Sequence, residues 1–164
     1  MALDSNVVAS NLFNVWNTTF TSSTSLVNIA KIIDDGFQMA TVSAPNFTIV
    51  VAAGSLVFPT TIVNGVEIVT PLDIATACSN YWALTILTDG TPQSCDNIDS
   101  VVNDANKIIE PITSGLIALA SSKTLSLPPY LDFVNIIFDN VKTIIWTIEE
   151  SDSTCNSTLT GTVS

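Results

Sequence analysis

Residues 60–70 have the sequence T-T-I-V-N-G-V-E-I-V-T. Asn64 and Gly65 stand between two β-branched runs, and this dipeptide favours a two-residue hairpin turn because both residues tolerate positive φ. The pattern predicts a β-hairpin with strands Thr60–Val63 and Val66–Val69. Because a single hairpin is only marginally stable in water, we expect it to pair with other strands or with other chains.

Two amphipathic segments precede this hairpin. Asp4 or Ser5 can cap the first, and the apolar residues of both segments recur every three or four positions, as on one face of an α-helix. We therefore expect a helical hairpin over residues 4–42. The two apolar faces consist of Val8, Leu12, Trp16 and Phe20 in the first segment and Leu26, Ile29, Ile33, Phe37 and Ala40 in the second.

Between the helical hairpin and the β-hairpin, the helical period disappears. Phe47–Val51 and Ser55–Phe58 are short apolar or β-branched runs that end at Gly54 and Pro59. Such runs, bounded by turn residues, are typical of strands. We expect a β region over residues 46–70.

The part of the chain after the hairpin predicts a helical region over residues 71–150. Thr70 and Pro71 suit the start of a helix that continues through Trp82. A second helical spacing extends from Ile98 to Ala120, with a kink or break at Pro111. A third segment, Tyr130–Glu150, is apolar nearly all round and predicts a long buried helix, although its β-branched residues 143–148 also fit a strand.

The last residues, 151–164, alternate without charge after Asp152 and predict a β-arm. The expected fold is a single α+β domain with two helix pairs, a long buried C-terminal helix, a central β-hairpin region and a C-terminal β-arm. An unpaired arm can add a strand to a neighbouring chain. Removal of residues 154–164 is then expected to stop assembly and leave a folded monomer.

The composition excludes several classes of function. The chain has 164 residues and a net charge of -11, with no histidine and no arginine among its four basic residues. This charge repels nucleic acid, and the chain lacks the commonest general base and metal ligand. No acidic cluster matches a calcium loop, so we expect neither catalysis nor a metal site or cofactor. No apolar run is long enough for a membrane helix.

The three cysteines are too few for a disulfide scaffold and lack the spacing of a zinc site. They fit idle thiols, or one bridge between Cys78 and Cys95 across the intervening loop, while Cys155 could pair with either. The three N-x-[ST] sequons, at Asn17, Asn46 and Asn156, carry no weight in a chain this rich in Asn, Ser and Thr.

Three features resemble small structural proteins of tailed bacteriophage virions: the opening M-A-L-D-S, the helix pairs interrupted by hydroxyl-rich β segments, and the closing L-T-G-T-V-S. The resemblance implies a noncatalytic capsid or tail component. Its partners would be other copies of itself and other virion structural proteins. The first residues lack the basic and apolar regions of a signal peptide, so we expect synthesis in the host cytoplasm without a leader.

Assembly through apolar helix faces and strand exchange requires apolar contact residues at the surface. The candidates are the tryptophans of the helical faces and the apolar residues near the C-terminus: Trp16, Phe20, Trp82, Trp146, Leu159 and Val163. Two other functions fit the same composition. One is an extracellular surface or filament subunit, and the other is a small domain that binds an apolar ligand.

Overall fold

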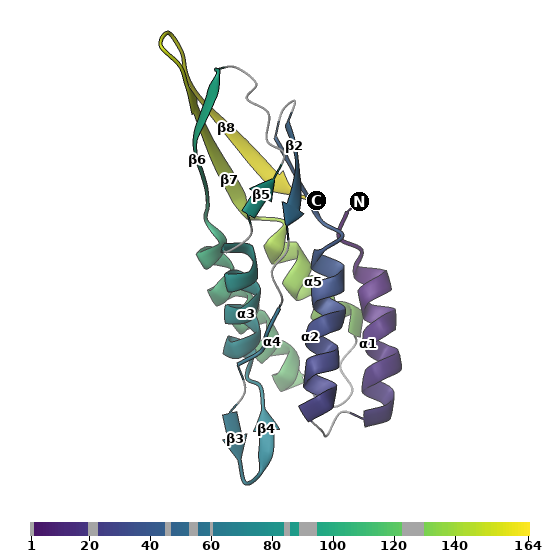
Figure 1. The fold of residues 1–164 in the computed structure, drawn as a ribbon. Coiled ribbons are helices and arrows are strands. Elements are labelled where there is room, and N and C mark those ends of the chain that lie inside the picture. The colour runs from purple at the N-terminus through teal and green to yellow at the C-terminus, as the bar shows by residue number, and fades with distance from the viewer. Residues whose placement is uncertain are drawn as a thin grey trace.

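The computed structural model describes residues 2–19, 23–44, 47–52, 56–59, 61–83, 86–88, 95–122 and 130–164. The fold is α+β, as the sequence predicts. Figure 1 shows the helices bundled side by side, with a six-stranded antiparallel sheet beyond one end of the bundle and a separate two-stranded hairpin beyond the other.

The N-terminal helical hairpin consists of α1 (Ser5–Thr19) and α2 (Ser23–Phe37), and it ends earlier than predicted, because Thr41 and Val42 belong to the strand β1 (Thr41–Ala44). Asp4 caps α1, because its Oδ1 accepts the backbone N–H groups of Asn6 at 3.0 Å and Val7 at 3.2 Å. The predicted apolar face of α2 is buried from Leu26 to Ala40. Gly36 lets α1 and α5 (Tyr130–Val141) approach α2, since a Cβ there would lie 2.6 Å from the Val8 side chain.

The third predicted helix is α3 (Pro71–Ala83), and it begins where the sequence places it. The Thr70 hydroxyl accepts the N–H of Asp73 at 3.2 Å, and the Asp73 carboxylate accepts the N–H of Thr70 at 2.8 Å. This reciprocal pair satisfies two backbone donors that the first turn of a helix leaves open.

Part of the region predicted as helical, residues 71–150, forms strands instead. Residues 98–103 belong to β6 (Asn97–Asn103), and residues 145–150 belong to β7 (Ile145–Ser151). The long C-terminal helix is therefore wrong beyond Val141. In β7 the buried side chains alternate, with Trp146, Ile148 and Glu150 inside, so the period is two and the strand alternative holds.

The helix predicted over residues 98–120 is reduced to a 3-10 turn, η1 (Ala105–Ile108), and α4 (Ile109–Ser122). The kink expected at Pro111 does not occur, because Pro111 lies in the first turn of α4. The N–H that proline lacks has no intrahelical partner at that position.

The sheet brings together strands from both halves of the chain. Its strand order is β5-β2-β1-β8-β7-β6, and every neighbouring pair is antiparallel. The predicted strand Phe47–Val51 is confirmed within β2, whereas residues 56–58 form no strand and Ser55 lies outside the described residues. Besides β6 and β7, the strands are β1 (Thr41–Ala44), β2 (Phe47–Ala52), β5 (Ile86–Thr88) and β8 (Asn156–Val163).

The predicted C-terminal arm is a strand, but it is not free. β8 lies between β1 and β7 of the same chain, with Val163 opposite Val42 and Leu159 opposite Ile148. The N–H of Ser164 donates to the carbonyl of Thr41 at 3.0 Å. β8 pairs with β7 over most of its length and with β1 at Thr162 and Val163, so the strand is satisfied mainly within its own chain.

One apolar core connects the helices to the sheet. Trp82 of α3 and Trp146 of β7 pack edge to face with ring centroids 5.9 Å apart. Phe37 of α2 packs against Trp82 at 5.4 Å and against Phe138 of α5 at 5.7 Å. These four side chains come from four elements and are almost completely buried, so the aromatic cluster fixes how the sheet sits on the bundle.

The hairpin predicted from residues 60–70 is confirmed as β3 (Thr61–Val63) and β4 (Val66–Ile68), and Thr60 lies outside the described residues. Asn64 and Gly65 both have positive φ, 52° and 77°, as the turn requires. In the part of the chain that the structure describes, the two strands pair only with each other. Figure 1 shows the hairpin projecting from the end of the bundle that is opposite the sheet.

Candidate functional site

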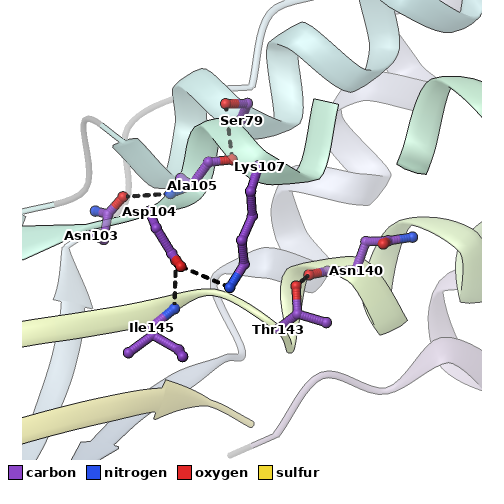
Figure 2. A network of polar contacts seen from close by, with 8 residues as sticks. All are labelled: Ser79, Asn103, Asp104, Ala105, Lys107, Asn140, Thr143 and Ile145. Carbon is purple, nitrogen blue, oxygen red and sulfur yellow. Dashed lines mark hydrogen bonds and ion pairs between the residues drawn. The ribbon is translucent and has the colours of Figure 1, made fainter. Parts of the chain in front are cut away.

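A network of polar contacts lies where the sheet meets the helices (Figure 2). Asp104 accepts the N–H of Ile145 at 2.8 Å and forms an ion pair with Lys107 at 2.7 Å. Burial raises the pKa of Asp104, but the bonds from Ile145 and Lys107 outweigh this effect and leave the pKa lowered. The Ser79 hydroxyl donates to the carbonyl of Ala105. The network uses its polar groups to hold β7 and α3 to η1, so its role is structural.

Asp34 of α2 is the second unusual carboxyl group. The sequence places it on the outer side of α2 with Lys31 and Asp35, and those two form an exposed ion pair at 2.8 Å. Asp34 instead has a buried Oδ1 without a hydrogen-bond partner among the described residues. Burial raises the pKa of Asp34, and the neighbouring charge of Asp35 raises it further. The hydrogen bond from the Leu56 N–H lowers the pKa, but it does not cancel the effect of burial.

Asp34→Asn is expected to stabilise the protein at neutral pH. Because the folded state raises the pKa of this carboxyl, the folded protein binds its proton more tightly, and stability falls as the pH rises above about 4. Asparagine does not ionise, so the variant does not lose this stability as the pH rises. Urea unfolding at acid and neutral pH measures it, with Asp139→Asn, at an exposed position of α5, as the control for overall charge. An equal effect of Asp34→Asn at both pH values would contradict the prediction.

The cysteines pair differently from the predicted bridge. Cys95 and Cys155 form the disulfide, and Cys78 is a free thiol with no exposed surface on α3. Helix α3 turns Cys78 into the core, so it cannot reach Cys95. Burial raises the pKa of the Cys78 thiol to about 12, which leaves it almost entirely protonated at neutral pH and therefore unreactive.

Among the described residues, one group has atoms of the kind that hold metals: Cys95, Asp152 and Cys155. Both sulfur atoms are used in the disulfide. The Asp152 carboxylate accepts the N–H of Thr154 at 2.7 Å and its hydroxyl at 3.1 Å, which shapes the turn between β7 and β8. The disulfide and the hydrogen bonds of Asp152 therefore explain why these three residues lie together.

The predicted contact residues are mostly part of the core. Trp82, Trp146 and Val163 are buried within their own chain, and Leu159 is partly buried against the same core. These four are therefore not free for contact with another chain. Phe20 and the side chain of Trp16 lie outside the described residues.

The surface does carry large apolar side chains, at other positions. The most exposed include Val57 next to the β3–β4 hairpin, at 70%, and Ile62 on β3, at 69%. Ile68 at the end of β4 is also exposed. An isolated hairpin with exposed apolar side chains is stabilised little by its own chain, and a partner that covers these side chains would stabilise it. This hairpin is the first candidate contact surface.

The second candidate is a groove along the seam between α1 and α5. It consists of two adjoining hollows of about 620 Å³ and 450 Å³ that share Asn6 and Leu131. Phe13 and Tyr130 meet edge to face at one end, with ring centroids 5.2 Å apart. Lys142 lines the other end. The remaining lining residues are mixed: Ser5, Ser10, Asn14 and Asn135 are polar, Ala2, Leu3, Ala9 and Met39 are apolar, and Asp4 is acidic.

Sequence reasoning missed the groove as a contact site, whereas it expected the hairpin to pair with other strands or other chains. Phe13 lies outside the repeating apolar face of α1, on a side where the sequence suggests only Asn and Ser. Leu131 fits the apolar spacing of α5 but is 41% exposed. The one available signal was the hairpin's inability to stand alone, which already indicated a need for other strands or chains.

None of the helices in the described part of the chain combines the length and the hydropathy that crossing a membrane requires. No protein-family model matches the sequence, and neither a curated protein nor a solved structure is detectably similar to it.

Proposed function

We propose that the protein is a noncatalytic structural subunit of a tailed-bacteriophage virion, assembled through apolar side chains that its own fold leaves exposed. The observation that carries the proposal is the β3–β4 hairpin, a separate two-stranded sheet with Ile62 and Ile68 exposed. The sequence resemblance to small virion proteins and the lack of histidine and arginine support it. Strand exchange by β8 is left out of the proposal, because β8 is paired with β7 over most of its length and with β1 at Thr162 and Val163.

The proposal predicts that the purified chain self-associates, and that salt strengthens the association. Each copy carries a net charge of -11, so copies repel one another at low ionic strength. Apolar contacts are not weakened when salt screens that repulsion. Sedimentation velocity at low and high sodium chloride measures the effect. A monomer at every salt and protein concentration would contradict self-assembly.

The virion assignment has its own test. Phage particles purified by density gradient from lysed host cells are expected to contain the chain in a fixed ratio to the major capsid protein. The ratio should survive washing with high salt and protease treatment of loosely bound protein. A chain that stays in the soluble fraction would overturn the virion assignment.

The disulfide favours a second candidate, an extracellular surface or filament subunit. Disulfides persist in oxidising compartments and are rare in the cytosol, and the Cys95–Cys155 bridge fits an extracellular setting. Asn156 is exposed at the start of β8, where a glycan could be attached. Intact mass spectrometry of the native protein separates the candidates, since glycans or a processed N-terminus would favour the surface protein.

A further inference from the structure

The two candidate surfaces lie on different parts of the molecule. The β3–β4 hairpin projects beyond the end of the bundle that is opposite the sheet (Figure 1), whereas the groove follows the seam between α1 and α5. Within one chain, the hairpin does not fill the groove. Between two chains, one copy can offer its hairpin while the other offers its groove.

We infer that the β3–β4 hairpin of one copy docks into the α1–α5 groove of a second copy of this chain. The inference rests on the proposed function as an assembly subunit, and it names the partner and the contact. Apolar contact comes from Ile62 on the hairpin and from Phe13 and Leu131 in the groove, all of which are exposed in the single chain. Burying such side chains releases water from apolar surface on both copies.

Hydrogen-bonding groups also match. A two-stranded sheet leaves the outer edges of both strands without a sheet partner, and among the described residues β3 and β4 pair with no strand except each other. The groove is lined by side-chain amides such as Asn6 and Asn135, which can both donate and accept hydrogen bonds. An edge of the hairpin can therefore be satisfied by the groove without another sheet.

Residues of opposite charge on the two surfaces favour one orientation of the hairpin along the groove. Glu67, opposite Ile62 in the hairpin register, is the only charged residue between Asp35 and Asp73. Lys31 and Lys107 are held in ion pairs, but Lys142 at the end of the groove makes no ion pair with any described residue. The hairpin segment thus brings one acidic residue to the contact, and the groove brings one lysine without an ion pair among the described residues. Asp4 also lines this end, but its Oδ1 is held by the N–H groups that begin α1.

Because the two surfaces differ, the contact is head to tail. Each bound copy still presents a free hairpin at one side and a free groove at the other, so further copies can add until a ring closes or a filament grows. A symmetric dimer would not have this property. The difference can be tested by mixing variants.

The experiment measures self-association of the full chain by sedimentation velocity and native mass spectrometry. Ile62→Asp removes the hairpin contact, and Ser10→Trp fills the groove at an exposed position without deleting a buried side chain. Each variant alone is expected to associate at least about 30-fold more weakly than the wild type, as for a central contact residue. Val27→Asp on the exposed face of α2, 67% exposed and outside both surfaces, is the matched control and should assemble normally.

Mixing the two variants is the decisive measurement. The Ile62→Asp chain keeps its groove and the Ser10→Trp chain keeps its hairpin, so an equimolar mixture should form a heterodimer that grows no further. Lys142→Glu and Glu67→Lys should each weaken assembly by up to about 5-fold, with recovery when one chain carries both changes. Unchanged thermal midpoints show that the variants are folded.

The outcomes separate this inference from the proposed function. A wild-type chain that is monomeric under all conditions overturns this inference and the self-assembly in the proposed function, while the virion assignment is decided by the content of purified particles. A wild type that assembles while Ile62→Asp and Ser10→Trp assemble equally well overturns the hairpin-in-groove contact alone. Loss of assembly in Ile62→Asp without heterodimer formation in the mixture shows that the hairpin binds elsewhere, and this result also overturns the inference.

Discussion

A chain that lacks residues 156–164 is expected not to fold. The deletion removes β8, the strand that connects β1 and β2 on one side of the sheet to β7 and β6 on the other. Sequence reasoning alone suggested a folded monomer that fails only in assembly, because it treated this segment as a free arm. The position of β8 inside the sheet reverses that expectation.

The size of the effect follows from what β8 contributes. It pairs with seven residues of β7 and continues into β1, and each backbone hydrogen bond contributes about 1 kcal/mol. Burial of the Leu159 and Val163 side chains adds about 1.5–3 kcal/mol for each when complete. The loss is comparable with the whole stability of a domain, about 5–15 kcal/mol.

Circular dichroism and urea unfolding of the truncated chain test this prediction. The matched control replaces residues 62–68 with a Gly/Ser linker of the same length. Because β3 and β4 form their own sheet, this control should keep the native spectrum and most of the stability. A truncated chain that unfolds cooperatively at a native-like urea concentration would contradict the role given to β8.

Loss of the Cys95–Cys155 disulfide is expected to lower the free energy of unfolding by about 4 kcal/mol. The two cysteines are 60 residues apart in sequence, so the bridge closes a long loop in the unfolded chain and removes much of its conformational freedom. In the folded chain, the bridge ties the residues before β6 to the turn after β7. The strands β6, β7 and β8 are then held together at the end of the sheet away from the helices.

Urea unfolding of a Cys95→Ser/Cys155→Ser double variant measures the loss. Reductant provides the control, because it should destabilise the wild type by a similar amount and leave the double variant unchanged. The buried Cys78 thiol is present in both proteins and stays protected until unfolding. A loss below about 1 kcal/mol, far under the loop-entropy value, would mean that the unfolded chain gains little freedom when the bridge is removed.

The parts of the fold that the sequence predicts are those with a strong local cause. Asp4 and Thr70 cap helices through their own side chains, and Asn64-Gly65 forces a turn whatever surrounds it. The apolar face of α2 is set by its spacing alone. Each of these signals involves residues close together in sequence, so no knowledge of the tertiary structure is required.

The missed elements depend on partners far away in the chain. Residues 98–103 have a spacing that fits a helix, but their pairing with β7, whose residues 145–151 lie far along the sequence, makes them a strand. The same pairing ends the predicted long helix at Val141. The Cys95–Cys155 bridge and the burial of Asp34 also depend on distant contacts. The groove could not be predicted because it arises from the seam between α1 and α5, not from a motif.

The central position of β8 has a further consequence for how the protein is made. Thr41 and Ser164 are 123 residues apart in sequence and are joined by hydrogen bonds. During synthesis, β1 therefore cannot pair with β8 until β8 has left the ribosome. At about 5–20 residues per second, this delay is roughly 6–25 s. During that time, one edge of β1 is open to other nascent chains or to chaperones. A message broken before the codons for β8 would yield a product that proteases can recognise and remove.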